Sequence, residues 1–297
     1  MGDLVEIVAG DTDSLYLCYE GLLNTIEGIE HMSISQKCEI LVNLNLEFLD
    51  DHNRQFIKDY YASRHCDSVH NFELETISKS ECRLDVKKRY AQILLWKDGK
   101  TFDIDNLPMK VKGLEMIKSS YPKQARDGLK RLTRYFLEDV GEEYLLQRLN
   151  IEMRNEKQLW MQAELEDICE NKGVQNYTKY IINDNNKEGL IVAPKCPYNV
   201  RALGQYNYLR NKYKLPGDPI YGGKVKIYQV VKQNPKSDDV FFAFQSRNLP
   251  DWALKYAPID RNAMFQKFLL DPFNRILGAV GLGSLNSDGY VQLGLFD

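Results

Sequence analysis

The chain has 297 residues, of which 43% are hydrophobic, and a formal net charge of −3. This length allows one large or two ordinary domains with a sizeable core. No stretch approaches the roughly 20 apolar residues of a membrane-spanning helix, and the N-terminus, with Asp3 and Glu6, lacks the basic region of a signal peptide. Six scattered cysteines without a Cys-x-x-Cys pair favour free thiols. We therefore expect a cytoplasmic protein without a membrane partner.

Charge is distributed unevenly along the chain. Residues 1–78 hold 4 Lys/Arg and 15 Asp/Glu, whereas residues 79–135 hold 15 and 7. An acidic segment followed by a basic one favours a metal-binding end beside a surface that binds a polyanion. Two solvated faces of opposite sign are the other interpretation.

The first part of the chain predicts strands and a helix within an α+β fold. Alternating apolar runs at 4–9 and 15–19 flank a Gly-Asp turn and predict a hairpin. Apolar residues then recur at helical spacing, and Ser33 or Ser35 can cap a helix that ends near Tyr61. Further strands are expected at 72–77, 89–96 and 101–104, with a turn at 97–100.

After Gly113 the pattern is mainly helical. Pro122 suits the first turn of a helix that reaches about Asp139. The following elements are expected after it: helices at about 142–171 and 200–212, a β pair at 224–231 and 241–244, and a helix at 260–277 that Pro272 bends. Residues 284–289 are expected to form a linker before a short apolar tail.

Asp11 and Asp13 lie one residue apart at the tip of the predicted hairpin. Paired carboxylates can hold a divalent metal for phosphoryl transfer. A calcium loop of EF-hand type is excluded, because its sixth and twelfth positions are Tyr16 and Leu22 rather than Gly and Glu. The manganese-binding motif of a nucleotide-sugar transferase and an ordinary acidic turn both remain open. His65-Cys66 with His70 has no second ligand pair at a spacing usual for zinc.

Several motifs in order along the chain narrow these alternatives. Gly10-Asp11-Thr12-Asp13-Ser14 resembles motif C of family B DNA polymerases, and Asp85-Val86-Lys87-Lys88-Arg89-Tyr90-Ala91 resembles their Lys-Lys-Arg-Tyr element. Residues 113–122 and 194–207 resemble the start and the signature of the thumb in T-even-phage-type polymerases, and the strand at 224–231 is similar to the one that follows. The resemblance implies the C-terminal part of a polymerase palm over 1–112, a mainly helical thumb over 113–283 and a flexible tail over 284–297.

The resemblance also implies roles for individual residues. Asp13 is the principal ligand of a two-Mg²⁺ site, Asp11 is the adjacent carboxylate near the primer end, and Glu75 lies where the family has another acidic residue. A solvent-facing strand residue is the alternative for Glu75. Contacts with primer–template DNA are implied or considered for Lys87, Lys88, Arg89, Tyr90 and Lys118. Lys88 and Tyr90 are expected to share one strand face toward the primer terminus, whereas Lys87 and Arg89 point the other way.

The helix after Pro122 carries further cations that can grip phosphates or form an exposed basic face. They are Lys123, Arg126, Lys130, Arg131 and Arg134.

The C-terminal segment Gln292-Leu293-Gly294-Leu295-Phe296 resembles the peptide that docks bacterial replication proteins on a sliding clamp. In that peptide Leu293, Leu295 and Phe296 would fill an apolar pocket, while Gln292 forms a hydrogen bond beside it. A tail with chance apolar residues is the alternative.

Motifs that precede motif C in the family are absent from these 297 residues: the second catalytic aspartate, the fingers motif of Lys-x-x-x-Asn-Ser-x-Tyr-Gly type and the exonuclease motifs. Either another chain supplies these motifs, or the sequence is part of a longer polypeptide. We favour the first and expect a DNA-dependent DNA polymerase that uses dNTPs and acts only with an N-terminal chain that carries them. Its location would be an infected bacterial cell if viral. A large apolar surface is expected where that chain docks. The alternative is a non-catalytic subunit that binds DNA and tethers a replication complex to the clamp.

Overall fold

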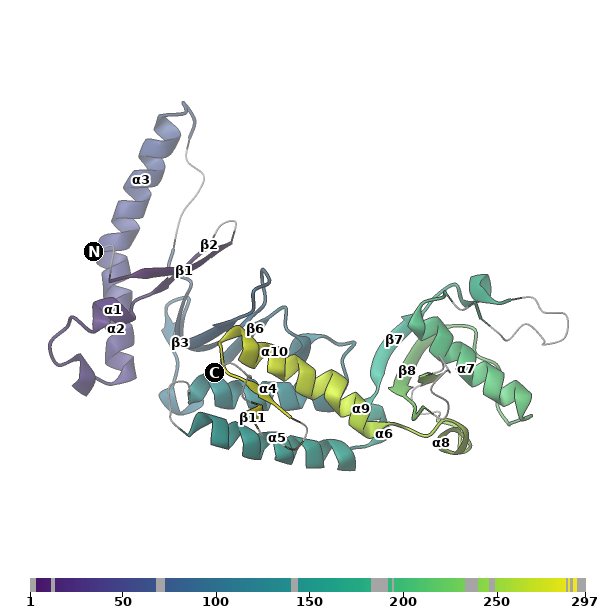
Figure 1. Cartoon of the computed structure of the whole chain (residues 1–297). Helices are drawn as coiled ribbons and strands as arrows, with labels where there is room; N and C mark the ends of the chain where they lie inside the picture. The colour runs from purple at the N-terminus through teal and green to yellow at the C-terminus, as the bar shows by residue number, and fades with distance from the viewer. Residues whose placement is uncertain are drawn as a thin grey trace. The chain divides into compact units, whose positions relative to one another are not determined.

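The computed structural model describes residues 4–11, 14–67, 73–139, 144–182, 192–193, 195–232, 240–245, 249–286, 288 and 291–292. The chain forms two compact units, Met1–Lys112 and Gly113–Asp297. Antiparallel sheets and helices occur together (Figure 1), which confirms the predicted α+β class. No helix in the described part of the chain has the length and apolar character that crossing a membrane requires.

Unit 1 begins with the predicted hairpin. Strands β1 (Glu6–Asp11) and β2 (Ser14–Cys18) are antiparallel, and Asp11 lies opposite Ser14. Two residues, Thr12 and Asp13, therefore connect the strands, while Gly10 lies within β1 instead of in the turn. The register shifts between Ile7 and Ala9, which marks a β-bulge at this point.

A long helix follows two short ones, α1 (Glu20–Leu23) and η1 (Ile29–His31). It consists of α2 (Ile34–Leu44), the π-helical segment η2 (Asn45–Leu49) and α3 (Asp50–Ala62). Ser33 caps it reciprocally, because Gln36 N–H donates to Ser33 Oγ and Ser33 N–H donates to Gln36 Oε1. The predicted cap and span are thus confirmed. Its buried residues are Cys38, Asp50 and Ile57, so most of the helix surface is not packed on unit 1.

The second sheet of unit 1 is centred on β4 (Tyr90–Lys97), whose residues 90–95 are buried. Strand β4 pairs with β3 (Thr76–Arg83), β5 (Lys100–Thr101) and β6 (Met109–Lys112). The prediction of a strand at 72–77 was wrong in position, because β3 starts at Thr76. Pairing with β4 stabilises Ser78–Arg83, whose small and charged side chains give little strand signal. The strand predicted at 101–104 ends at Thr101, since Ile104–Asn106 forms the 3-10 turn η3.

The helical part of unit 2 contains η4 (Glu115–Ile117), α4 (Lys123–Glu138), α5 (Leu145–Gln162) and α6 (Leu165–Ile168). Helix α4 matches its prediction. The helix predicted at 142–171 is too long, because it ends at Gln162 and Ala163 is extended. Arg261 stabilises this end by donating 3.0 Å hydrogen bonds to the carbonyl oxygens of Trp160 and Ala163.

The rest of unit 2 contains a three-stranded antiparallel sheet of β7 (Glu170–Val174), β8 (Gly223–Gln229) and β9 (Phe241–Phe244). Helix α7 (Tyr198–Lys212) packs on it, and Val200, Leu203 and Ile227 belong to their shared core. The predicted helix at 200–212 and the β8–β9 pair are confirmed, whereas β7 occupies the end of the over-long predicted helix. The short helices η5 (Tyr177–Tyr180) and α8 (Ala253–Tyr256) complete this part.

The last long helix follows as α9 (Arg261–Phe265), the π-helical segment η6 (Gln266–Leu270) and α10 (Asp271–Ala279). Asp271 N–H bonds to Gln266 O, five residues back, immediately before Pro272, which has no N–H to donate. The irregularity expected at Pro272 is this π-helical turn.

Beyond α10, strand β10 (Ser284–Leu285) pairs with β11 (Val291–Gln292). The Asn274 amide exchanges two hydrogen bonds with the backbone of Leu285, which is buried. The flexibility expected of a linker therefore does not extend to Ser284–Leu285.

Candidate active site

The candidate site begins at the β1–β2 loop. Asp11 is the last residue of β1, and only its backbone position is described; Asp13 lies outside the described residues. Asp11 and Asp13 are separated by one residue in the sequence, and carboxylate oxygens are the donors that Mg²⁺ prefers. The donor set therefore fits a magnesium site in its chemistry. Within the described residues, no cluster of three or more His, Cys, Asp or Glu side chains could hold a metal ion.

The two faces of the hairpin have different surroundings. Residues that pair across the strands share a face, so Ala9 and Tyr16 lie on one face, and Ile7 with Leu17 on the other. Tyr16 lies against the second sheet: its ring centre is 6.0 Å from that of Tyr90, in an edge-on arrangement. The site loop thus leads into a strand whose inner face is supported by β3 and β4.

Arg83 of β3 completes this support. Its guanidinium carbon lies 3.7 Å from the centre of the Tyr16 ring and 4.7 Å from that of Tyr90. Burial raises the pKa of Tyr16, but hydrogen bonds with Tyr90, Arg83 and Ser14 outweigh it and lower the pKa overall. Burial, together with the hydrogen bond to Tyr16, raises the pKa of Tyr90. Tyr16 thus belongs to a polar cluster with Arg83 and Tyr90, three residues after Asp13 in the sequence.

Arg83 also forms an ion pair with Glu81, whose Oε2 accepts a 3.4 Å hydrogen bond from Gln92. Burial raises the pKa of Glu81, and Arg83 partly opposes this. Sequence reasoning missed Tyr16, Glu81 and Arg83. Alternation in the hairpin marks Tyr16 as facing away from Leu15, but no local pattern identifies the strand that meets it.

Glu75 is not in a strand. It precedes β3, and its Oε1 accepts a 3.0 Å hydrogen bond from Lys110 of β6. This hydrogen bond and the nearby Lys110 charge lower the pKa of Glu75. Its side chain is 64% exposed. Glu75 is therefore an ionised, accessible carboxylate held by one lysine, and its role as a metal ligand stays a prediction.

The expected shared face of Lys88 and Tyr90 is wrong. Strand β4 begins at Tyr90, and Lys88 lies in the exposed turn before it, with φ +61°. Lys87 is exposed in the same turn, and Arg89 closes it by accepting a hydrogen bond from Leu84 N–H. Tyr90 is 2% exposed, against Arg83 and Tyr16. The turn therefore exposes Lys87 and Lys88 to solvent, whereas the buried Tyr90 packs against Tyr16 of the hairpin.

Four of the six cations of unit 2 that we considered for DNA contacts are engaged within the protein. Lys118 pairs with Glu115 at 3.2 Å, and Lys123 pairs with Asp167 at 3.1 Å. Further along α4, Arg131 donates two hydrogen bonds to the buried Glu156, and Arg134 pairs with Glu138. Contacts of these residues with DNA stay a prediction and would compete with the internal pairs.

The thumb-like signature joins α7 to its surroundings. Tyr198 donates a 2.7 Å hydrogen bond to Glu170, and Asn199 donates one of 2.8 Å to Gly173 O. The fully buried Asn207 donates to Tyr177 Oη and Ile220 O, and accepts from Ile220 N–H. These hydrogen bonds join α7 to strand β7 through Tyr198 and Asn199, and to the loop at Ile220 through Asn207.

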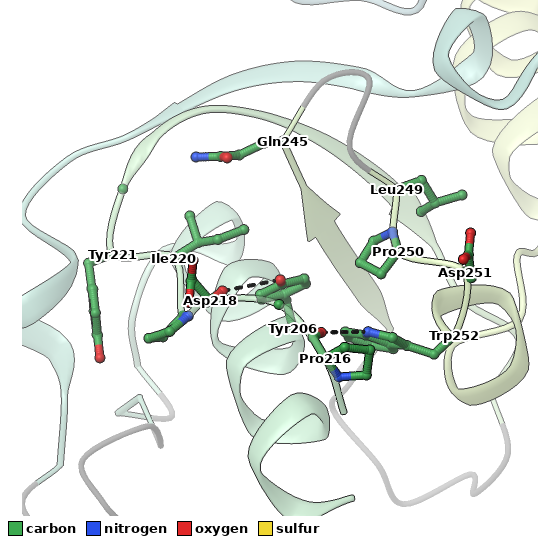
Figure 2. Close-up of a pocket in the computed structure, with 13 residues that line it drawn as sticks. Tyr206, Pro216, Asp218, Ile220, Tyr221, Gln245, Leu249, Pro250, Asp251 and Trp252 are labelled. Atoms are coloured by element: carbon green, nitrogen blue, oxygen red, sulfur yellow. Dashed lines mark hydrogen bonds between the residues drawn. The ribbon is translucent and has the colours of Figure 1, made fainter. Parts of the chain in front are cut away.

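An open cavity of about 770 Å³ lies between the loop at 216–222 and residues 249–252. Figure 2 shows Tyr206 and Trp252 at the wall of this cavity. Tyr206 donates a hydrogen bond to the backbone oxygen of Asp218, and Trp252 donates one to that of Pro216. Its exposed carboxylates are Asp218 and Asp251. An acidic lining of this kind does not favour a phosphate ligand.

The C-terminal peptide is described only in part. Gln292 belongs to β11, and nothing is described of its side chain. Leu293, Leu295 and Phe296 lie outside the described residues. Upstream, Asp288 is bound by Arg154 and Lys157 of α5. The clamp-binding role stays a prediction.

Comparison with known proteins gives one informative similarity. No family model matches the chain. The chain is 26% identical to a DNA-directed DNA polymerase of Enterobacteria phage T4, in an alignment of 290 residues that covers 93% of this chain. It spans 30% of the length of that polymerase. The chain is therefore distantly similar to part of a phage DNA polymerase.

Proposed function

We propose that this chain is the C-terminal palm and thumb of a DNA-dependent DNA polymerase of family B, and that it supplies two carboxylates to a two-metal nucleotidyl-transfer site. The observation that carries the proposal is the strand–loop–strand at Asp11–Ser14, in a chain similar to a phage DNA polymerase over most of its length. Unit 1 corresponds to the palm in this proposal, and residues 113–283 to the thumb.

The reaction joins the primer 3′-oxygen to the α-phosphorus of a dNTP and releases pyrophosphate. Bound Mg²⁺ stabilises the negative charge that develops on the attacking and leaving oxygens. Asp13 and Asp11 would hold it, with Glu75 as a further carboxylate nearby. The Tyr16–Arg83–Tyr90 cluster fixes β2 behind the loop, and such fixed placement of ligands contributes to catalysis.

In this proposal the duplex lies over a surface with exposed cations. Lys87 and Lys88 in the β3–β4 turn are the candidates in unit 1. Phosphate contacts of this kind give affinity that falls as salt rises and that does not depend on base sequence.

The proposed enzyme needs a second polypeptide region. The motifs absent from this sequence, among them the second metal-binding aspartate, would come from a partner that carries the exonuclease, fingers and remaining palm. A sliding clamp would bind the C-terminal peptide and hold the assembly on DNA.

Primer extension with purified components tests the proposal. We expect extension only when this chain and the partner are combined with Mg²⁺, and loss of extension with Asp11→Asn or Asp13→Asn. The matched control is Asp105→Asn, in the exposed turn η3. Full extension by both site variants would contradict the catalytic role and favour the non-catalytic DNA-binding and clamp-tethering subunit instead.

A further inference from the structure

Exposed apolar side chains are concentrated at the start of unit 1. On the hairpin, Ile7 is 67% exposed and Leu15 is 55% exposed. Leu15 lies two residues from Leu17 on β2, and Leu17 pairs with Ile7, so the three share the face opposite Tyr16. One face of the hairpin is thus packed through Tyr16 on the second sheet, while its apolar face is largely uncovered.

The hairpin also has unpaired strand edges. Within the described residues, β1 and β2 pair only with each other. An isolated two-stranded hairpin is marginally stable in water, and a free strand edge readily accepts another strand. The free strand edges and the apolar face of the hairpin are together suited to binding a polypeptide that contributes a further strand and apolar side chains.

The long helix that follows the hairpin in the sequence also exposes large apolar side chains. Leu46 and Phe48 of η2 are 57% and 64% exposed, and Phe56 and Tyr60 of α3 are 64% and 45% exposed. The Phe56 and Tyr60 rings stack with centres 6.4 Å apart. Large apolar side chains in such number on one short stretch are typical of an interaction site.

The charge of this region restricts the occupant. Residues 1–78 carry 15 acidic and 4 basic residues, and the exposed acids Glu47, Asp51 and Asp59 lie among the exposed aromatic residues of the helix. A nucleic acid is disfavoured by this charge. A protein with an apolar face and a basic border is favoured.

We propose that the apolar face of β1–β2 and the exposed side chains of η2 and α3 form the docking surface for the polypeptide that carries the remaining palm and the fingers. This inference rests on the proposed function and specifies where the partner binds. The relative in phage T4 is more than three times as long as the region this chain matches, so a polypeptide with the remaining sequence is an occupant of suitable size. It would cover Ile7, Leu15 and Leu17 and place basic residues near Glu47 and Asp51.

Binding of this chain to that partner tests the surface. The probe is the product of the reading frame in the same genome that carries the fingers motif. We expect Ile7→Lys/Leu15→Lys to weaken binding by about 10- to 100-fold, because two apolar contacts are replaced by solvated charges. The matched control is Ile151→Lys on α5, where Ile151 is 57% exposed and binding should not change. Since all three positions are exposed, each variant should unfold at the wild-type temperature.

A charge reversal provides a second measurement. Glu47→Lys/Asp51→Lys should weaken binding and reduce its dependence on salt. Binding that is unchanged in both double variants, or wild-type binding that cannot be detected, would overturn the proposal. A self-associated chain that Leu15→Lys dissociates, measured by sedimentation, would assign the surface to a second copy and also overturn it.

The outcome is separable from that of the proposed function. Asp11→Asn/Asp13→Asn should keep full affinity for the partner while primer extension is lost. Partner binding that depends on Leu15, in a complex that extends no primer, would retain the docking surface and reject the catalytic proposal. Primer extension by a complex that Leu15→Lys leaves intact would retain the catalytic proposal and reject the docking surface.

Discussion

The Arg83 guanidinium carbon lies 3.7 Å from the centre of the Tyr16 ring, so β3 holds the strand that directly follows the Asp11–Asp13 loop. Tyr16 is remote in sequence from Arg83 and from Tyr90, and these two residues pair with each other across β3 and β4. The support of the candidate site is therefore a tertiary property of unit 1.

Replacement of Arg83 by Met should destabilise unit 1 by about 1–3 kcal/mol, because it removes a cation–π contact and leaves Glu81 without its partner. The loss should depend on pH. Burial already raises the pKa of Glu81, and removal of Arg83 raises it further. A carboxyl group with a raised folded-state pKa binds a proton preferentially in the folded protein, so the variant regains stability as pH falls through that folded pKa toward the unfolded pKa of about 4.3.

Urea unfolding at several pH values measures this effect. Glu81→Gln/Arg83→Met is the control, since its stability should not follow the Glu81 titration. A destabilisation of Arg83→Met that stays constant from pH 8 down to the unfolded pKa of about 4.3 would contradict the ion-pair explanation.

Replacement of Glu75 by Gln should change stability by less than about 1 kcal/mol, because the carboxylate is mostly exposed. The Lys110 hydrogen bond lowers the pKa of Glu75, so this small contribution is present above the unfolded pKa of about 4.3 and disappears as pH falls through the folded value. If Glu75 assists the metal site, the Mg²⁺ concentration for half-maximal primer extension should rise by about tenfold. Lys110→Met removes the ion pair but keeps the carboxylate, and an equal Mg²⁺ requirement in both variants would exclude a ligand role.

Replacement of Asn207 by Leu should destabilise unit 2 by about 1–3 kcal/mol, because the N–H and C=O of Ile220 lose their partner. Hydrogen exchange at the Ile220 amide should accelerate. Tyr177→Phe removes only the third hydrogen bond of Asn207 and should cost less. Equal losses in the two variants would show that the Ile220 contacts contribute nothing.

Replacement of Asn274 by Ala should release Leu285 from α10, since the Asn274 amide satisfies both polar backbone groups of that residue. We expect faster exchange of the Leu285 amide and a loss of about 1 kcal/mol. Asn274→Asp keeps the acceptor for this amide and should protect it partly. Exchange at the wild-type rate in Asn274→Ala would indicate that β10 is held by other contacts.

Replacement of Leu295 and Phe296 by Ala should abolish stimulation of primer extension by a sliding clamp, while extension without the clamp should be unchanged. Gly294→Ala changes a position of the peptide that is not expected to enter the pocket and serves as the matched control. Stimulation that persists in the double variant would leave the tail without this role.

Elements with strong local signals were predicted from the sequence. The alternating hairpin, the helix capped at Ser33 and the apolar β8–β9 pair all depend on residues close in the chain. Strands β3 and β7 were misplaced or missed because their polar residues form strands only through pairing with β4 and β8. The left-handed turn at Lys88 likewise moved a predicted contact residue off its strand.

The candidate site was predictable in part. Adjacent carboxylates at a hairpin tip are visible in sequence, whereas the Arg83–Tyr16 contact requires two sheets to meet. The ion pairs of Lys123 and Arg131 were equally hidden, because their partners Asp167 and Glu156 belong to other helices of the unit. A basic helix in sequence therefore said little about which cations are available to a ligand.

The contacts of Asp288 limit how far the proposed clamp-binding peptide can reach. Arg154 and Lys157 hold Asp288 on α5, and Leu295 follows seven residues later. Seven extended residues span at most about 25 Å. In the proposed assembly, Leu295 bound to a clamp would therefore lie within about 25 Å of Asp288, and lengthening the segment after Asp288 would weaken this proximity.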